Sequence, residues 1–126
     1  MARKPLIFIV DDSAGACKAI EELLKANGFT VKAFTGASEL LKSRELPHPD
    51  CLVLDVQMPA MGGLELSSRL VASGIRIPTI FITAFPQDAA RRHALASGAA
   101  DYLAKPFRAR DLLRAVRLAL KTRNRQ

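Results

Sequence analysis

The stretch CLVLDVQMPAMGGLEL, from Cys51 to Leu66, decides how this chain folds. Its first four residues form a continuous apolar run, which is typical of a strand buried on both faces of a sheet. Asp55 follows that run at once, and a carboxylate at the end of a core strand costs free energy unless something pairs with it. The stretch therefore predicts a buried strand with a functional group at its end.

The composition favours a globular protein of a reducing compartment. The chain has 126 residues, of which 49% are hydrophobic, enough to build one core. No apolar run approaches the ~20 residues of a membrane span, and the apolar stretch after the basic N-terminus is too short for a signal peptide. Cys17 and Cys51 lack metal-like spacing and are expected to be packing residues. We therefore expect a cytoplasmic protein with no membrane partner.

Four other short apolar runs are similar to the one before Asp55, and helix-like segments lie between them. Strand and helix, repeated five times, predict a parallel sheet with helices on both faces. Without a repeat or a dividing linker, residues 1–126 are expected to form one domain, with a core at about 5–121 and a basic tail at 122–126. The expected strands are Leu6–Val10, Thr30–Phe34, Cys51–Leu54, Thr79–Ile82 and Ala100–Leu103.

The helical segments carry local start and stop signals. The first helix is expected at Ser13–Ala26, where the leading serine can cap the helix and Asn27-Gly28 ends it. Gly74 and Gly98 are expected to end two further helices in the same way. The last helix is expected at Arg108–Arg123.

The residues that follow the strands are the candidates for a site, because ligands of open parallel sheets bind beyond the carboxyl ends of the strands. Three of these residues are aspartates and one is a lysine. Three carboxylates stay ionised together only with a cation among them, and one lysine does not supply enough charge. All-oxygen ligands without His or Cys favour Mg²⁺ over zinc. The candidates are three carboxylates, a hydroxyl and an ammonium: Asp11, Asp12, Asp55, Thr83 and Lys105.

This set of groups suits phosphoryl transfer, in which a carboxylate attacks phosphorus while the metal and the ammonium neutralise the phosphoryl oxygens. A flavodoxin or a nucleotide binder would need a glycine-rich loop that faces the phosphate. The first loop here starts with Asp11 and Asp12, which would repel phosphate. Independent helix capping remains an alternative for these two acids, but it does not explain why Asp55 and Lys105 also end their strands.

The sequence contains four blocks that bear on the site: VDDS at 10–13, LDVQMPAMGG at 54–63, FITA at 81–84 and GAADYLAKPF at 98–107. In this order and spacing, they resemble a response-regulator receiver domain of bacterial two-component signalling, a CheY-like domain of the FixJ/NarL type. The resemblance covers essentially the whole chain. It implies a flavodoxin-like α/β fold, a doubly wound five-stranded parallel sheet of order 2-1-3-4-5 flanked by five helices.

The resemblance implies a phosphorylation and metal site. Asp55 corresponds to the phosphoacceptor and Asp12 to a direct Mg²⁺ ligand. Asp11 corresponds to an acid that holds the metal through water. Gln57 corresponds to the position whose backbone carbonyl binds the metal.

The resemblance also implies a switch. Thr83 corresponds to the switch hydroxyl, and Lys105 to the phosphate-binding lysine, whose bond to Pro106 is expected to be cis. Tyr102 corresponds to an aromatic residue that swings inward after phosphorylation. The alternative for Tyr102 is a plain, half-buried strand tyrosine.

Two residues after Thr83 are expected to tune the rates of the site. Ala84 is small and should leave phosphodonors room to approach Asp55. Phe85 is large and apolar, and we hypothesise that it restricts the hydrolytic water and prolongs the phosphorylated state. The two histidines, His48 and His93, are expected to lie outside the site.

The helix expected at Gln87–Ser97 should be weakly held, because its buried face would be mostly alanine and thin burial stabilises little. Leu95 is its one large apolar residue. We therefore expect this helix to be part of a moving face. The alanines expected on the buried face are Ala89, Ala90, Ala94 and Ala96.

The positive charge is concentrated in the last third of the chain. Residues 1–90 carry a net charge of −1, and residues 91–126 carry +8. A solvated stripe, a docking surface for an acidic protein and a nucleic-acid surface are the three interpretations; no helix-turn-helix or stacking aromatics favour the last. The basic residues at issue are Arg91 and Arg92, and the helical stripe of Arg110, Arg114, Arg117 and Lys121.

The leading hypothesis is a phosphoacceptor switch. A sensor histidine kinase or a histidine phosphotransfer protein would donate to Asp55 with Mg²⁺, and the face of the fourth helix, fifth strand and fifth helix would control an output partner, expected to be transcriptional. The chain is not expected to be an enzyme beyond its own phosphorylation and dephosphorylation. The alternative is a phosphorylation-independent module that binds protein or nucleic acid through its basic C-terminal face. A free-standing receiver and a piece of a longer regulator both fit the sequence.

Overall fold

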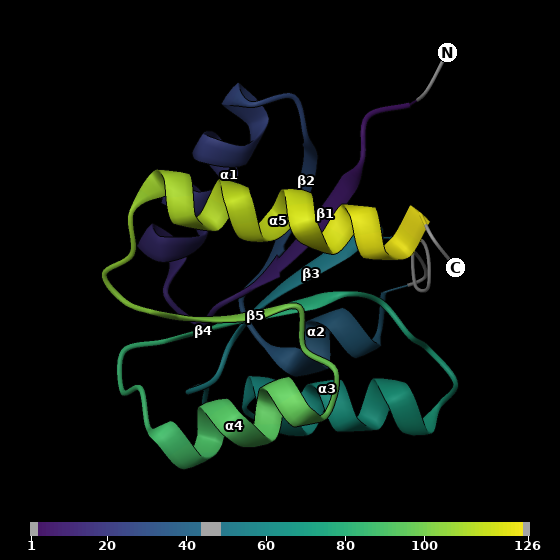
Figure 1. Cartoon of the computed structure of the whole chain (residues 1–126), viewed down its shortest axis with the longest axis vertical. Helices are drawn as coiled ribbons and strands as arrows, with labels where there is room; N and C mark the ends of the chain where they lie inside the picture. The colour runs from purple at the N-terminus through teal and green to yellow at the C-terminus, as the bar shows by residue number, and fades with distance from the viewer. Residues whose placement is uncertain (1–2, 44–48, 125–126) are drawn as a thin grey trace.

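The computed structural model describes residues 3–43 and 49–124. Five parallel strands form one sheet in the order β2-β1-β3-β4-β5, with helices on both faces (Figure 1), which confirms the expected fold class. The strands are β1 (Leu6–Val10), β2 (Thr30–Phe34), β3 (Cys51–Asp55), β4 (Thr79–Thr83) and β5 (Asp101–Ala104). The helices are α1 (Ala14–Ala26), α2 (Ala37–Leu41), α3 (Gly63–Ala72), α4 (Asp88–Ala96) and α5 (Ala109–Asn124).

Four strand boundaries, in three strands, differ by one residue from those expected. β3 and β4 extend to include Asp55 and Thr83, and β5 is shifted by one residue, to Asp101–Ala104. Asp55 is paired with Ile82 in the sheet register. The sheet itself, and not a loop, therefore carries the Asp55 carboxylate.

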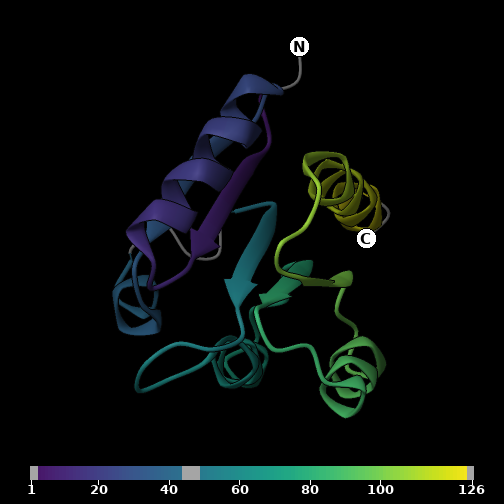
Figure 2. The ribbon, with the colours of Figure 1, turned by 90° about the vertical axis from the view of Figure 1, so that its left-hand side faces the viewer.

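Two apolar layers fill the space between the sheet and its helices. α1 and α5 cover one face, and α2, α3 and α4 cover the other (Figures 1 and 2). Because side chains alternate along a strand, Ile7 and Ile9 face the first layer, whereas Phe8 and Val10 face the second. No helix within the described residues is long and apolar enough to cross a membrane.

Three helices end on a glycine with positive φ, as expected. At the end of α1, Gly28 has a φ of 91°, and the N–H groups of Gly28 and Phe29 donate to carbonyl oxygens of the last turn. Gly74 and Gly98 end α3 and α4 with the same pair of hydrogen bonds. Glycine alone adopts this left-handed conformation at little cost, so local sequence was enough to predict these ends.

α4 buries even fewer residues than expected, and part of the prediction for its buried face was wrong. Ala94 is buried and Ala90 is half-buried, but Ala89 and Ala96 are exposed, and the Leu95 side chain is 39% exposed. α4 lies at the edge of the sheet and packs mainly against β5. An edge position covers only a narrow stripe of a helix, which explains why so few of its residues are buried.

The end of the chain is helical further than expected, because α5 continues to Asn124. Residues 125 and 126 of the expected tail, and His48, lie outside the described residues. His93 is exposed on α4. The division into a core and a tail stays a prediction.

Candidate functional site

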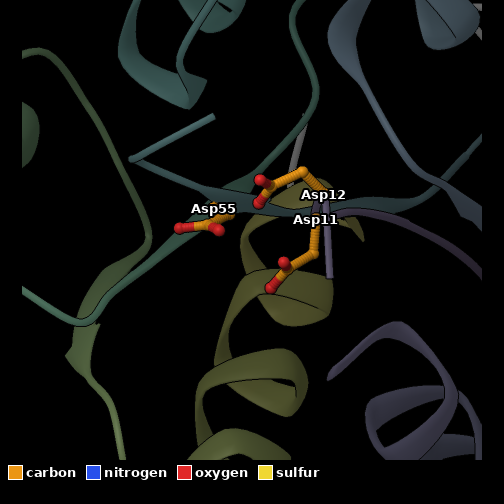
Figure 3. Close-up of side chains that lie close together, drawn as sticks. All are labelled: Asp11, Asp12 and Asp55. Carbon is orange, nitrogen blue, oxygen red and sulfur yellow. The ribbon is translucent and has the colours of Figure 1, made fainter. Parts of the chain in front are cut away.

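Three acids from two neighbouring strands meet at the carboxyl edge of the sheet. Asp11 and Asp12 directly follow β1, and Asp55 ends β3, which is paired with β1. One carboxylate oxygen from each of the three lies within 4.8 Å of the others. Figure 3 shows these side chains close together. The parallel register thus joins residues that are more than forty positions apart in the sequence.

The Lys105 ammonium binds two of these carboxylates. Its Nζ donates to Asp11 Oδ2 at 2.8 Å and to Asp55 Oδ2 at 3.5 Å. The backbone holds the lysine in place, because the Lys105 N–H donates to the Thr83 carbonyl at 2.7 Å. The Lys105–Pro106 bond is cis, as the resemblance implies.

The three acids differ in burial. Asp11 is fully buried, Asp55 is 5% exposed and Asp12 is exposed. Asp11 is also tied to the chain that follows it, because its Oδ1 accepts the Ser13 N–H at 2.9 Å. Two acids are therefore part of the packed interior, and the third faces solvent.

The pKa values of Asp55 and Lys105, at the centre of the site, are both raised, but for different reasons. Burial, and then repulsion from Asp11, raise the pKa of Asp55 to about 6, although Lys105 and the Gln57 N–H act in the opposite direction. Burial acts to lower the pKa of Lys105, but the hydrogen bond and charge of Asp11 and the charge of Asp55 outweigh it, so the pKa of Lys105 is raised. Lys105 therefore keeps its positive charge, but that charge alone does not offset the cost of ionising Asp55.

These residues fit a bound Mg²⁺. The site holds three carboxylates, and the one ammonium that contacts them pairs with only two, so a divalent cation would balance the excess of negative charge. The acids offer hard oxygen ligands, and the exposed position of Asp12 would leave room for the water ligands that Mg²⁺ usually keeps.

The Thr83 hydroxyl is fully buried and already hydrogen-bonded. Its Oγ1 donates to Gln57 Oε1 at 2.5 Å and accepts the Phe85 N–H at 3.0 Å. This contact between the Gln57 side chain and Thr83 was not expected from the sequence. No local signal could have found this contact, because the loop after β3 and the end of β4 create it.

The loop after Asp55 folds tightly against its own strand. A Cβ atom at Gly62 would lie 2.4 Å from the Val56 carbonyl oxygen, and one at Gly63 would lie 2.5 Å from the Asp55 carbonyl oxygen. Only glycine fits at both positions. In the same loop Ala60 has a φ of 69°, a left-handed conformation that non-glycine residues rarely adopt.

Of the two predicted tuning residues, Ala84 is exposed and the Phe85 side chain is 68% exposed. Tyr102 lies in β5 and is 5% exposed, so it is buried more deeply than the half-buried strand tyrosine of the alternative. Its ring lies 6.5 Å from that of Phe81, and its hydroxyl has no hydrogen-bond partner among the described residues. The inward swing of Tyr102 and the tuning roles stay predictions.

The basic residues of α4 and α5 lie on the surface. Arg91 and Arg92 are exposed on α4. On α5, the apolar side chain of Leu118 is also 48% exposed. All four members of the predicted α5 stripe are exposed: Arg110, Arg114, Arg117 and Lys121. This group of α5 side chains is called the basic stripe below.

The chain is similar to bacterial response regulators. Response regulator protein TmoT of Ectopseudomonas mendocina is 39% identical over 119 residues, which cover 94% of this chain and 54% of TmoT. Nodulation protein W of Bradyrhizobium diazoefficiens is 38% identical over 113 residues, which cover 90% of this chain and 50% of that protein. The chain thus spans about half the length of the curated relatives it matches.

The chain is also similar to response regulators whose structures have been solved. The crystal structure of FixJ-N has a TM-score of 0.86 at 32% identity and covers 95% of this chain and 96% of that chain. The response regulator StyR has a TM-score of 0.84 at 38% identity, over 97% of this chain and 62% of that chain. The family model of the response regulator receiver domain matches residues 7–117. Fold, acid site and these likenesses together show that the chain belongs to the response regulator receiver domain family.

Proposed function

We propose that the chain is a phosphoacceptor switch in which Asp55 takes a phosphoryl group from a sensor histidine kinase or a histidine phosphotransfer protein. The observation that carries the proposal is the position of Asp55 at the end of β3, within 3.5 Å of the Lys105 ammonium and beside two further acids. An Asp55 oxygen attacks phosphorus, the bond from phosphorus to the donor nitrogen breaks, and that nitrogen leaves with the electron pair.

The carboxylates of Asp11, Asp12 and Asp55 and the backbone carbonyl of Gln57 are the groups proposed to hold Mg²⁺. When bound, the ion neutralises charge on the phosphoryl oxygens. The Lys105 ammonium would help to neutralise the same phosphoryl oxygens, since it already contacts two of the acids. The acids and the lysine therefore prepare Asp55 for an anionic group.

The switch is proposed to run through Thr83 and the face formed by α4, β5 and α5. The Thr83 hydroxyl would donate to a phosphoryl oxygen on Asp55, and Tyr102 would change its position as α4 moves. The weak burial of α4 supports this, because a helix with one fully buried residue is easily displaced. Beyond its own phosphorylation and dephosphorylation, we propose no enzymatic activity.

The output is proposed to be transcriptional and the location cytoplasmic. Two matched relatives, TdiR of Thauera aromatica and DctD of Rhizobium meliloti, are named transcriptional regulatory proteins. The exposed basic stripe on α5 supports an acidic protein partner or output domain on this face. Direct binding of nucleic acid is not part of the proposal.

A second candidate function is a phosphorylation-independent module that binds protein or nucleic acid through its basic C-terminal face. The basic stripe is the observation that favours it. Binding of a partner with equal affinity by the native chain, its phosphorylated form and Asp55→Asn would support this candidate over the switch.

The intact mass of the protein after incubation with acetyl phosphate and Mg²⁺ tests the switch. We expect one added phosphoryl group, which is absent without Mg²⁺ and absent from Asp55→Asn. The asparagine variant is a matched control, because it keeps the shape of the side chain and removes the nucleophile. A native chain that stays unmodified and does not bind beryllofluoride, a phosphoryl mimic, would refute the proposal.

Phe85 is proposed to slow the loss of the phosphoryl group. Its side chain is 68% exposed, and its N–H donates to Thr83 Oγ1, so it lies next to the site without being part of the core. We expect Phe85→Ala to lose the phosphoryl group about 2- to 10-fold faster, measured by the decay of the phosphorylated mass. An unchanged decay rate would show that Phe85 does not restrict the water.

A further inference from the structure

We infer that the Gln57 side chain is a latch on the switch: it holds the Thr83 hydroxyl, and it must release that hydroxyl before Thr83 can bind a phosphoryl group on Asp55. The inference rests on the proposed function, because it concerns the same site. It gives the Gln57 side chain a positioning role that is separate from the metal-binding role proposed for its backbone carbonyl.

The first step of the argument is the proton count at Thr83. A hydroxyl has one proton to donate. Here the Phe85 N–H donates to Oγ1 at 3.0 Å, and the hydroxyl donates its proton to Gln57 Oε1 at 2.5 Å. A phosphoryl oxygen can therefore receive the Thr83 proton only after the hydrogen bond to Gln57 has broken.

The second step is the difference in burial between the two partners. Thr83 is fully buried, whereas Gln57 is exposed. After release the Gln57 amide can bind water, but a buried hydroxyl without an acceptor is costly. The hydroxyl therefore leaves Gln57 readily only when another acceptor, such as a phosphoryl oxygen, is at hand.

The third step is that Gln57 also contacts the phosphoacceptor. Its backbone N–H donates to Asp55 Oδ1 at 3.2 Å. A continuous path of hydrogen bonds thus runs from Asp55 through Gln57 and Thr83 to Phe85, shortly before α4 begins. A change at Asp55 acts directly on the residue that holds the switch hydroxyl.

The competing explanation is that the Gln57 side chain only narrows the path to Asp55. A double-mutant cycle separates the two, because a steric effect does not need the Thr83 hydroxyl. Gln57→Met keeps the length of the side chain and removes the acceptor, and Thr83→Ala removes the hydroxyl. The matched control is Gln87→Met, since Gln87 is also exposed and its side chain makes no capping hydrogen bond.

The measurement is the Kd of beryllofluoride at saturating Mg²⁺, followed by fluorine NMR. We expect Gln57→Met to bind about 2- to 10-fold more tightly, the value of one released hydrogen bond. Gln87→Met should bind like the native chain, and Gln57→Met should bring no gain in the Thr83→Ala background. An equal gain in both backgrounds, or no gain in either, would overturn the latch.

A second measurement without Mg²⁺ or a phosphoryl mimic keeps the test independent of the proposed function. In EDTA, Gln57→Met should lower the thermal midpoint by about 2–6 °C, and it should not lower it further in Thr83→Ala. Coupled midpoints in a chain that does not bind beryllofluoride would refute the proposed function alone. Midpoints that add independently would overturn the latch, whatever the ligand does.

Discussion

Helices α1 and α4 have the same kind of ending but very different anchors. Each follows a strand that ends at the site, and each stops at a glycine with positive φ, Gly28 or Gly98. α1 starts with a side-chain cap and fully buries one large leucine, whereas α4 has no side-chain cap. The buried residues are Cys17, Ile20 and Leu24 in α1, and Ala94 alone in α4.

The difference in packing suggests that the α1 side of the site is fixed, whereas the α4 side can move. α1 packs against β1 and β2 and supports the strand end that carries Asp11 and Asp12. α4 follows Thr83 and Phe85 on a narrow contact with the edge strand β5. A charge change at Asp55 should therefore displace α4 more easily than α1.

The largest expected effect comes from shortening one leucine in each helix. Leu24 is fully buried in α1 and Leu95 is 39% exposed in α4. We expect Leu24→Ala to lower the free energy of unfolding by about 2–5 kcal/mol and Leu95→Ala by about 1 kcal/mol or less. Urea unfolding of both variants measures this, and similar losses would break the comparison.

Hydrogen exchange should show the same difference in the native chain. We expect the interior amides of α4 to exchange at least about 100-fold faster than those of α1, which corresponds to an opening free energy lower by about 2.7 kcal/mol. Exchange followed by mass spectrometry on peptides from the two helices is sufficient. Equal protection of α1 and α4 would contradict the interpretation of α4 as the moving element.

Removing the Asp55 charge should stabilise the metal-free protein. The native pKa of about 6 lies above the unfolded value of 3.8, so the cost of ionising this carboxyl grows as pH rises through that window. We expect Asp55→Asn to raise the free energy of unfolding by about 1–3 kcal/mol at neutral pH and to have no such effect below about pH 4. Urea unfolding in EDTA at the two pH values is the measurement.

A gain of the same size at both pH values would show that packing, and not charge, explains the Asp55→Asn effect. Mg²⁺ should reverse the preference, because the ion stabilises the native chain but finds one ligand fewer in the variant. The difference in the free energy of unfolding would measure how much the buried Asp55 charge, with its repulsion from Asp11, destabilises the metal-free protein.

The smallest expected effects concern the caps. Ser13 Oγ accepts the Ala16 N–H at 3.2 Å at the start of α1, so Ser13→Ala should cost about 1 kcal/mol. Gln87 has an extended backbone and makes no side-chain cap at the start of α4. We expect Gln87→Ser to stabilise the chain by about 0.5 kcal/mol and to slow exchange in α4. A destabilising Gln87→Ser would mean that α4 cannot use a cap.

Local sequence signals were sufficient for most of the fold. The five apolar runs became the five strands, and the stops at Gly28, Gly74 and Gly98 came true, because both signals depend on neighbouring residues alone. The short helix α2 was expected only as part of the alternation. With five residues and no side-chain cap it carries little local signal of its own.

In the functional site, too, some features follow from the sequence and others from the tertiary structure. The sequence alone determined which groups come to the edge of the sheet, because the carboxyl ends of parallel strands necessarily meet there. Only the tertiary structure decided how these groups pair. Lys105 contacts Asp11 across 94 positions and Thr83 contacts Gln57 across 26, and the exposure of most of α4 follows from its place at the sheet edge. Such pairings depend on packing between distant segments, which no local propensity or period encodes.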